Sequence, residues 1–171
     1  SLFFVFNLGG KGLRFRHIEP KPTKTCAIIR YGAIGDSIQT SSIFPWLKDQ
    51  GYHVTMYCQD GPGYDIIKHD PHIDRFIIQE RDAVPPAFLE EFWTYTKKKY
   101  NKWVNLCESI EGTLLAIPGR PNHEWPNEAR AYHMDHNYLE WTHKIAEVPA
   151  PYRPKFYSTN EERAWARQKA S

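Results

Sequence analysis

The chain has 171 residues, which is enough for one hydrophobic core and one domain. Its 41% hydrophobic and 25% charged residues are ordinary for a soluble globular protein. The net charge of +2 is too small to indicate a nucleic-acid partner without a clustered basic patch, and no run of about 18 apolar residues is present that would span a membrane.

The N-terminal 23 residues differ in character from the rest. Residues 1–23 are interpreted as an extension, and residues 24–171 as the folded domain. The apolar start has no basic residue ahead of it, so it lacks the pattern of a signal peptide. We expect the extension to pack on the domain. The alternatives are an edge strand, a hairpin arm, or a patch on a partner in which Lys11, Arg14 and Arg16 contact phosphates or lipid headgroups.

A strand, a glycine turn and a helix follow each other over residues 25–40. The apolar run in residues 25–31 predicts a strand buried on both faces. Gly32 and Gly35 then allow a sharp turn, and Asp36 or Ser37 is the expected cap of a helix over residues 37–50. Pro45 should kink that helix. Asp36 is thereby expected at the carboxyl edge of a sheet, where ligands bind in open α/β folds, although packing alone would also explain the glycines.

The same alternation of strand and helix continues along the chain. Further strands are predicted over residues 53–58, 75–79, 102–107 and 153–157, and further helices over residues 64–69, 87–101, 110–117, 132–146 and 161–169. This order predicts a doubly wound, Rossmann-like parallel sheet. The helix over 87–101 should bury a face made of Phe88, Leu89, Phe92 and Tyr95, and the loop over 59–63 should lie at the same sheet edge as the Asp36 turn.

The cysteines indicate the redox environment. Cys26, Cys58 and Cys107 are odd in number, form no C-x-x-C pair and fall in predicted strands. We therefore expect reduced core residues of a cytoplasmic protein.

Several polar residues in the second half of the chain are candidates for the same cleft. Glu108 and Ser109 follow a predicted strand as Asp36 does, although Ser109 would equally serve as a plain helix cap. Arg120 and Arg130 lie in or beside a long irregular stretch and would bind an anionic sugar or phosphate, or simply form surface charges. His133 and His136 are expected to line the cleft, because no third ligand at suitable spacing supports a metal site.

The turn motif also limits the protein families to which the chain could belong. Two glycines spaced G-x-x-G without a third are not a dinucleotide fingerprint, and no Gly-Lys-Ser/Thr sequence makes a P-loop. The stretch IIRYGAIGDSIQT over residues 28–40 instead resembles the start of the family 9 glycosyltransferases, which include the ADP-heptose:lipopolysaccharide heptosyltransferases. Pro45 departs from that pattern, because family members often carry their proline nearer position 42.

This resemblance implies the N-terminal, acceptor-binding half of a GT-B fold and inverting transfer of a heptose-like sugar. Asp36 carries over as the general base, and Gly32, Ala33, Gly35 and Gln39 carry over as acceptor contacts. The partners implied are a saccharide, glycolipid or lipopolysaccharide-type acceptor and a C-terminal donor domain that this chain has no room for. A nucleotide sugar is expected as a substrate, without a cofactor or metal, and the chain alone should be inactive.

Two other functional classes stay open. The chain could be a non-catalytic binding or scaffolding module that keeps the fold, or a nucleotide-binding half of another α/β enzyme. The exposed edge that would meet a donor domain makes self-association a further expectation. The location implied is the cytoplasm, with peripheral contact at the inner face of the membrane as an alternative.

Overall fold

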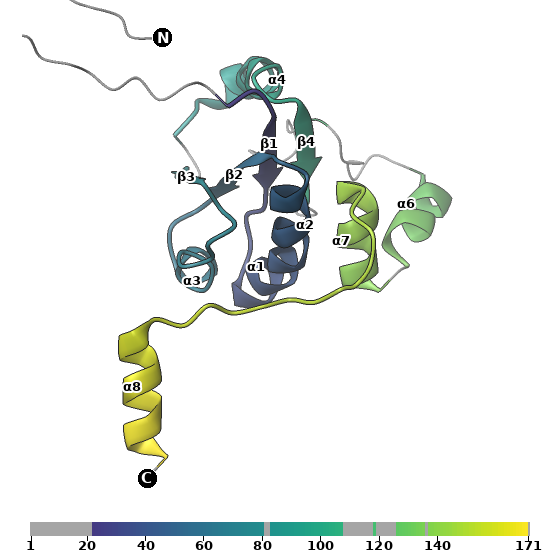
Figure 1. Cartoon of the computed structure of the whole chain (residues 1–171). Coiled ribbons are helices and arrows are strands. Elements are labelled where there is room, and N and C mark those ends of the chain that lie inside the picture. The colour runs from purple at the N-terminus through teal and green to yellow at the C-terminus, as the bar shows by residue number, and fades with distance from the viewer. Residues whose placement is uncertain (1–21, 81–82, 108–117, 119–125, 136, 171) are drawn as a thin grey trace, which may run out of the picture.

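A four-stranded parallel sheet forms the centre of the computed structural model, which describes residues 22–80, 83–107, 118, 126–135 and 137–170 (Figure 1). The strand order is β3-β2-β1-β4, and all three strand pairs are parallel. The strands are β1 (Thr25–Ile29), β2 (His53–Cys58), β3 (Arg75–Ile78) and β4 (Lys102–Asn105). These four strands match the predicted ones closely, because each is a short apolar run followed by turn residues.

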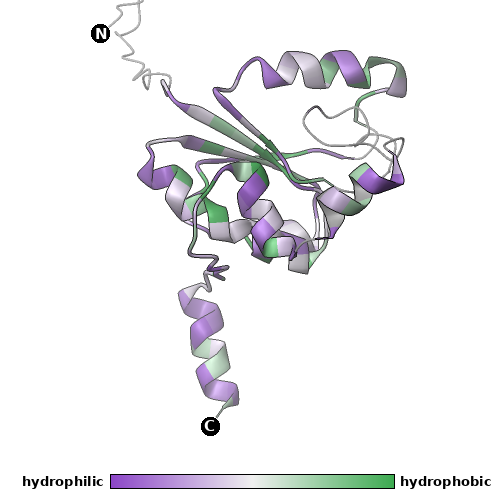
Figure 2. Ribbon diagram, turned by 90° about the vertical axis from the view of Figure 1, so that its right-hand side faces the viewer, coloured by the Kyte–Doolittle hydropathy of each residue, from purple (hydrophilic) through white to green (hydrophobic). Residues whose placement is uncertain are grey.

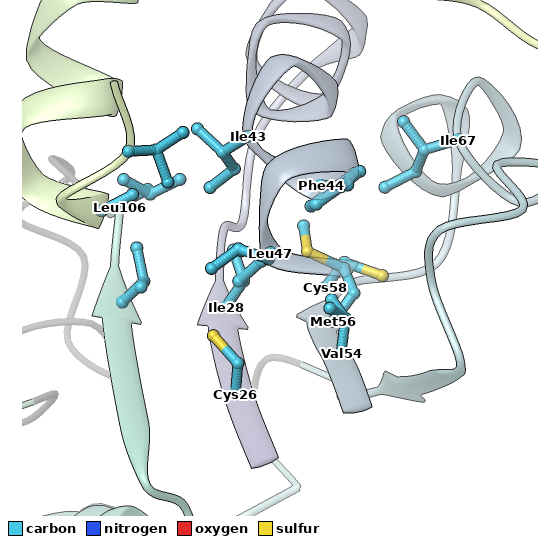
Figure 3. Close-up of a cluster of buried hydrophobic side chains, with 13 residues drawn as sticks. Cys26, Ile28, Ile43, Phe44, Leu47, Val54, Met56, Cys58, Ile67 and Leu106 are labelled. Carbon is cyan, nitrogen blue, oxygen red and sulfur yellow. The ribbon is translucent and has the colours of Figure 1, made fainter. Parts of the chain in front are cut away.

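Helices cover both faces of the sheet (Figure 2). Successive side chains of a strand point to opposite faces, and β1 therefore feeds two clusters. Cys26 and Ile28 pack in a larger cluster with residues of η1 (Ser41–Ile43), α2 (Phe44–Asp49) and α7 (Tyr138–Ala146), and α1 (Ile34–Thr40) directly precedes η1 (Figure 3). Ala27 and Ile29 pack in a smaller cluster with Trp93 of α4 (Leu89–Lys97). The doubly wound Rossmann-like fold predicted from the sequence is therefore confirmed.

The buried face of α4 agrees with the predicted one only in part: Leu89 is buried and Phe92 packs against the smaller cluster, but the other two predicted residues are exposed. Leu89, Trp93 and Thr96 are buried, whereas Phe88 and Tyr95 are 58% and 61% exposed. The helix begins at Leu89, after the 3-10 turn η2 (Pro86–Phe88), so Phe88 lies before its first turn. Trp93 makes an edge-on contact with Tyr57, at 5.8 Å between ring centroids. Burying the larger indole against the sheet decides which side of the helix faces inward.

The long helix predicted over residues 37–50 is broken. It consists of α1, η1 and α2, which lie end to end. Pro45 sits in the first turn of α2, where its missing N–H would otherwise bond one turn back, and this explains the break. The interruption of the α-helix thus lies at η1, just ahead of Pro45. Gly51, at φ 80°, follows the end of α2.

The C-terminal third departs most from prediction. The single helix expected over 132–146 is two helices, α6 (Asn127–Met134) and α7, and the side chain of Asn137 caps α7 by accepting from Leu139 N at 3.0 Å. Residues 153–157 are extended but form no strand. Pro151 and Pro154 lack the N–H donors that a sheet partner needs, and the segment lies against the helix layer, where Lys155 N donates to Ser41 Oγ at 2.8 Å.

The chain ends with α8 (Asn160–Lys169), which stands away from the body (Figure 1). A capping box closes its N-terminus: Thr159 Oγ1 accepts from Glu162 N, and Glu162 Oε2 accepts from Thr159 N. A short α3 (Pro62–Asp65) begins two residues earlier than predicted. All three cysteines are buried, as expected. Within the described ranges, none of the helices has the length and apolarity needed to cross a bilayer.

His143 makes the stability of this fold sensitive to pH. Its ring is buried where α7 meets η1, with Nε2 2.8 Å from Ser42 Oγ and Nδ1 3.2 Å from Val148 O. Burial lowers the pKa of His143 below its ordinary 6.5. The unfolded chain therefore binds a proton at higher pH than the folded one, and the free energy of unfolding falls as the pH drops below about 6.5.

We expect His143→Gln to reduce this pH dependence, because an amide cannot take up the proton. Urea unfolding at pH 7 and pH 5 measures the loss of unfolding free energy in each protein. The matched control is His69→Gln, at an exposed position, which should lose as much as the parent. Equal losses in the His143→Gln protein and the parent would contradict the assignment.

Candidate functional site

Arg30 joins the carboxyl ends of the neighbouring strands β1 and β4. It follows β1 directly and is only 6% exposed. Its Nη1 donates to the carbonyl oxygen of Leu106, just past β4, and its Nη2 donates to Asp36 Oδ1. The chain proceeds from β1 to β2 and β3 on one side, whereas β4 lies on the other side of β1. Arg30 and Asp36 therefore occupy the switch point of the sheet, where ligands bind in open α/β folds.

Asp36 lies inside the first turn of α1, so neither it nor Ser37 is the N-cap residue, but the Asp36 carboxylate does cap an N–H group at the start of the helix. The N-cap is Ala33, and Asp36 Oδ2 accepts from the backbone N–H of Ala33 at 2.9 Å. The helix starts earlier than predicted because a carboxylate in the first turn can reach back to satisfy an N-terminal N–H group. Both carboxylate oxygens are thus held, and the side chain is 32% exposed.

Gly32 is required by this arrangement. A Cβ at position 32 would lie 2.4 Å from Asp36 Oδ2, closer than atoms can approach. The glycine that the sequence suggested for a sharp turn therefore serves a close approach of its own backbone to the carboxylate.

A pocket of about 580 Å³ opens beside the turn. Two segments at the carboxyl edge of neighbouring strands form its walls, and its lining residues are Tyr31, Gly32, Ala33, Ile34, Gly35, Gln59, Asp60, Pro62 and Gly63. The loop over residues 59–63 thus lies at the same edge as the Asp36 turn, as predicted. Asp36 is one residue beyond the lining segment, with its carboxylate turned toward Gly32 and Arg30.

The second wall was not selected as part of the site from the sequence. Gln59 and Asp60 bring an amide and a carboxylate to the pocket, and Asp60 Oδ1 accepts from Gly61 N at 3.0 Å. Gly63 allows α3 to approach the turn, because a Cβ there would lie 2.5 Å from the carbonyl oxygen of Gly32. The sequence position of Gln59 and Asp60 could have identified them, since polar residues directly after β2 lie beside those after the adjacent parallel strand β1.

The remaining predicted residues divide into three groups. Gly32, Ala33 and Gly35 line the pocket. Gln39 lies on α1, partly buried, and its Oε1 has no hydrogen-bond partner among the described residues. Glu108, Ser109, Arg120 and His136 lie outside the described residues, and only the helical backbone of Arg130 and His133, in α6, is described.

The geometry suits proton transfer from a hydroxyl group. A carboxylate with a fixed orientation and partial exposure can accept a proton from a hydroxyl placed within hydrogen-bond reach. Tyr31 stays a neutral hydroxyl, because burial raises its pKa, and it donates to Gln79 Oε1 at 3.1 Å. Gln59 and Asp60 place an amide and a carboxylate at the pocket, and such groups can bond to hydroxyl groups of a ligand.

Comparison with known proteins gives the class of this fold. No family model and no curated protein matches the sequence. The crystal structure of a glycosyl transferase family 9 protein from Veillonella parvula DSM 2008 is similar, with a TM-score of 0.57 and 14% identity over 90% of this chain and 50% of that chain. The chain therefore has the fold of about half of a family 9 glycosyltransferase structure.

A second solved structure, ADP-heptose lps heptosyltransferase II from E. coli, aligns with a TM-score of 0.46 and 16% identity, over 87% of this chain and 51% of that chain. The chain thus spans about half the length of each of these structures.

Alanine substitutions at two of the three glycines that line the pocket, Gly35 and Gly63, should have opposite effects on stability. Gly63→Ala should lower the free energy of unfolding by about 1–3 kcal/mol, because its Cβ would also lie 2.9 Å from Ser37 Oγ. Gly35→Ala is the matched control: it is helical, no described atom lies within 4 Å of its Cβ, and alanine should add up to about 1 kcal/mol. Denaturant unfolding distinguishes them, and equal stability of the two variants would contradict the close packing.

Arg30→Lys should also destabilise the domain. One ammonium group cannot bond to Leu106 O and Asp36 Oδ1 as the two guanidinium nitrogens do, so we expect a loss of about 1–3 kcal/mol. Arg75→Lys, on the exposed side of β3, should change stability by less than about 0.5 kcal/mol. The measurement is the urea midpoint of each protein, and a midpoint for Arg30→Lys equal to that of the control would refute the bridge.

Proposed function

We propose that this chain is the acceptor-binding domain of an inverting glycosyltransferase of family 9. The observation that carries the proposal is the Asp36 carboxylate, held by Arg30 at the switch point of the sheet and next to a pocket. The fold shared with half of a family 9 structure supports it. So does the resemblance of residues 28–40 to the start of that family.

The proposed reaction divides the work between two domains. A saccharide or glycolipid acceptor, of the lipopolysaccharide type, occupies the pocket beside Gly32 and Gly35. A second domain presents a nucleotide sugar, with a heptose-like sugar as the group transferred. Cytoplasmic action, at or near the inner face of the membrane, would give the enzyme access to both substrates.

Asp36 acts as the general base in this proposal. The acceptor oxygen attacks the anomeric carbon, the bond from that carbon to the nucleotide diphosphate breaks, and the hydroxyl proton passes to the Asp36 carboxylate. Arg30 keeps the carboxylate oriented through its contact with Oδ1. As the proton arrives, either the hydrogen bond from Ala33 N to Oδ2 lengthens, or Oδ2 takes the proton while still accepting from Ala33 N.

A non-catalytic binding module is the second candidate. The specific observation in its favour is that both oxygens of Asp36 already bond within the fold. On this alternative, the carboxylate only completes the turn, and the pocket binds a saccharide without transferring anything to it.

The test is transfer from a nucleotide diphosphate sugar to a saccharide acceptor by the protein at its full natural length. Asp36→Asn should lower kcat by about 10²–10⁴-fold and leave the acceptor KM nearly unchanged, because the amide keeps the shape but cannot take the proton. Asp65→Asn, on the exposed surface of α3, is the control and should keep full activity.

Two outcomes separate the candidates. Full activity of Asp36→Asn would refute the general base. If the parent protein and Asp36→Asn bind the acceptor equally and neither transfers a sugar, the binding-module alternative holds instead.

A further inference from the structure

A second pocket lies on the outer side of the helix layer, away from Asp36. Its volume is about 400 Å³, and it shares no lining residue with the pocket beside the glycine turn. It forms between α2 and residues 148–157, which we call the strap. The strap is fixed to the body at several points, including the bond from Lys155 N to Ser41 Oγ at 2.8 Å. The size is at the lower end of the range for small-molecule sites.

The walls of this pocket provide flat apolar surfaces. Trp46 of α2 lines it from the body, and Pro149, Pro151 and Tyr157 line it from the strap. Indole, phenol and proline rings are rigid, so they offer area for stacking without much loss of side-chain freedom. A ligand with a planar ring fits such walls better than a flexible chain does.

One imidazole in the pocket is fixed by a buried carboxylate. His72 lines the pocket, and its Nδ1 lies 2.7 Å from Asp70 Oδ1. That oxygen also accepts from the backbone N–H of His72 at 2.9 Å. The carboxylate thus fixes the ring, and Nε2 remains as the nitrogen that can bond to a ligand.

This arrangement is costly for stability alone. The side chain of Asp70 is 2% exposed, and its Oδ2 has no hydrogen-bond partner among the described residues. A buried carboxylate oxygen without a partner destabilises the fold, because the hydration it loses is not replaced. Tyr157 adds a second contact to the same ring, with its hydroxyl 3.4 Å from His72 Nδ1. Packing alone does not explain why a carboxylate is buried here, whereas orienting His72 toward a ligand would.

The charges at the rim favour an anion. Arg153 and Lys155 both line the pocket from the strap, against the single carboxylate of Asp49 from α2. Lys155 Nζ lies 4.7 Å from the centroid of the Tyr157 ring, so a cation stands over one of the stacking surfaces. A guanidinium and an ammonium at one rim suit a phosphate group.

We propose that this second pocket binds a small organic phosphate with a planar ring, such as a nucleoside monophosphate. The ring lies against Trp46 and Tyr157, and the phosphate bonds to Arg153 and Lys155. His72 Nε2 forms the third polar contact. The proposal does not depend on the sugar-transfer function, because none of these residues belongs to the site around Asp36.

Binding of AMP to the purified chain tests the proposal, with adenosine and inorganic phosphate as the two half-ligands. Titration calorimetry measures affinity, and backbone amide NMR locates the bound probe. AMP should bind at least about tenfold more tightly than either half-ligand, because ring and phosphate are held together. Shifts should centre on α2, His72 and the strap.

Substitutions of exposed side chains can identify the anion site, because they should leave the stability of the fold unchanged. The double variant Arg153→Gln/Lys155→Gln should weaken AMP binding about tenfold or more. The matched control, Arg167→Gln/Lys169→Gln, removes the same two kinds of charge from exposed positions on α8 and should not change it. His72→Gln should weaken AMP binding, and Asp36→Asn should leave it unchanged.

Three results would overturn the proposal. AMP could bind no better than adenosine, or the variant at 153 and 155 could bind it as tightly as the control. The amide shifts could also centre on residues 32–35, which would place AMP in the pocket beside Asp36.

Discussion

The ion pair between Arg30 and Asp36 is the interaction on which the candidate site depends. Arg30 is buried, and a buried charge needs a paired, hydrogen-bonded partner; its Nε has no partner among the described residues, so its two terminal nitrogens make these bonds. One donor nitrogen takes the carbonyl of Leu106 and another takes Asp36, so the bond that neutralises the charge also joins β1, β4 and the start of α1. The same guanidinium group therefore both links the two strands and fixes the position of the Asp36 carboxylate.

Two close backbone contacts, at glycine residues, also hold the site together. Gly32 leaves room for the Asp36 carboxylate, and Gly63 leaves room for α3 to pack against the turn. The pocket exists because these two segments meet at the edge of neighbouring parallel strands. This edge of the sheet carries ligand sites in many open α/β proteins. The position of the pocket is therefore consistent with the fold that the chain shares with half of a glycosyltransferase structure.

The sequence predicted the four strands and the doubly wound order, because buried strands and their turn residues are local signals. It failed where distant contacts decide the outcome. The inward face of α4 is set by Trp93 packing on Tyr57 across the sheet, and no window of helix residues contains that partner. The strap reads as a strand, yet its prolines leave it without a sheet partner, and it lies on the helix layer instead. The role of Asp36 as general base stays a prediction.

What the sequence determined by itself is the glycine turn after a buried strand and the arrival of Asp36 at the edge of a parallel sheet. These follow from short-range patterns and from the handedness of strand–helix–strand units. Only the tertiary structure decided that Arg30 holds the carboxylate, that Gln59 and Asp60 form the opposite wall, and that a second pocket lies under the strap. Both pockets join segments far apart in the chain, and Arg30 also bonds to the distant Leu106, so these contacts depend on how the elements pack rather than on any local preference.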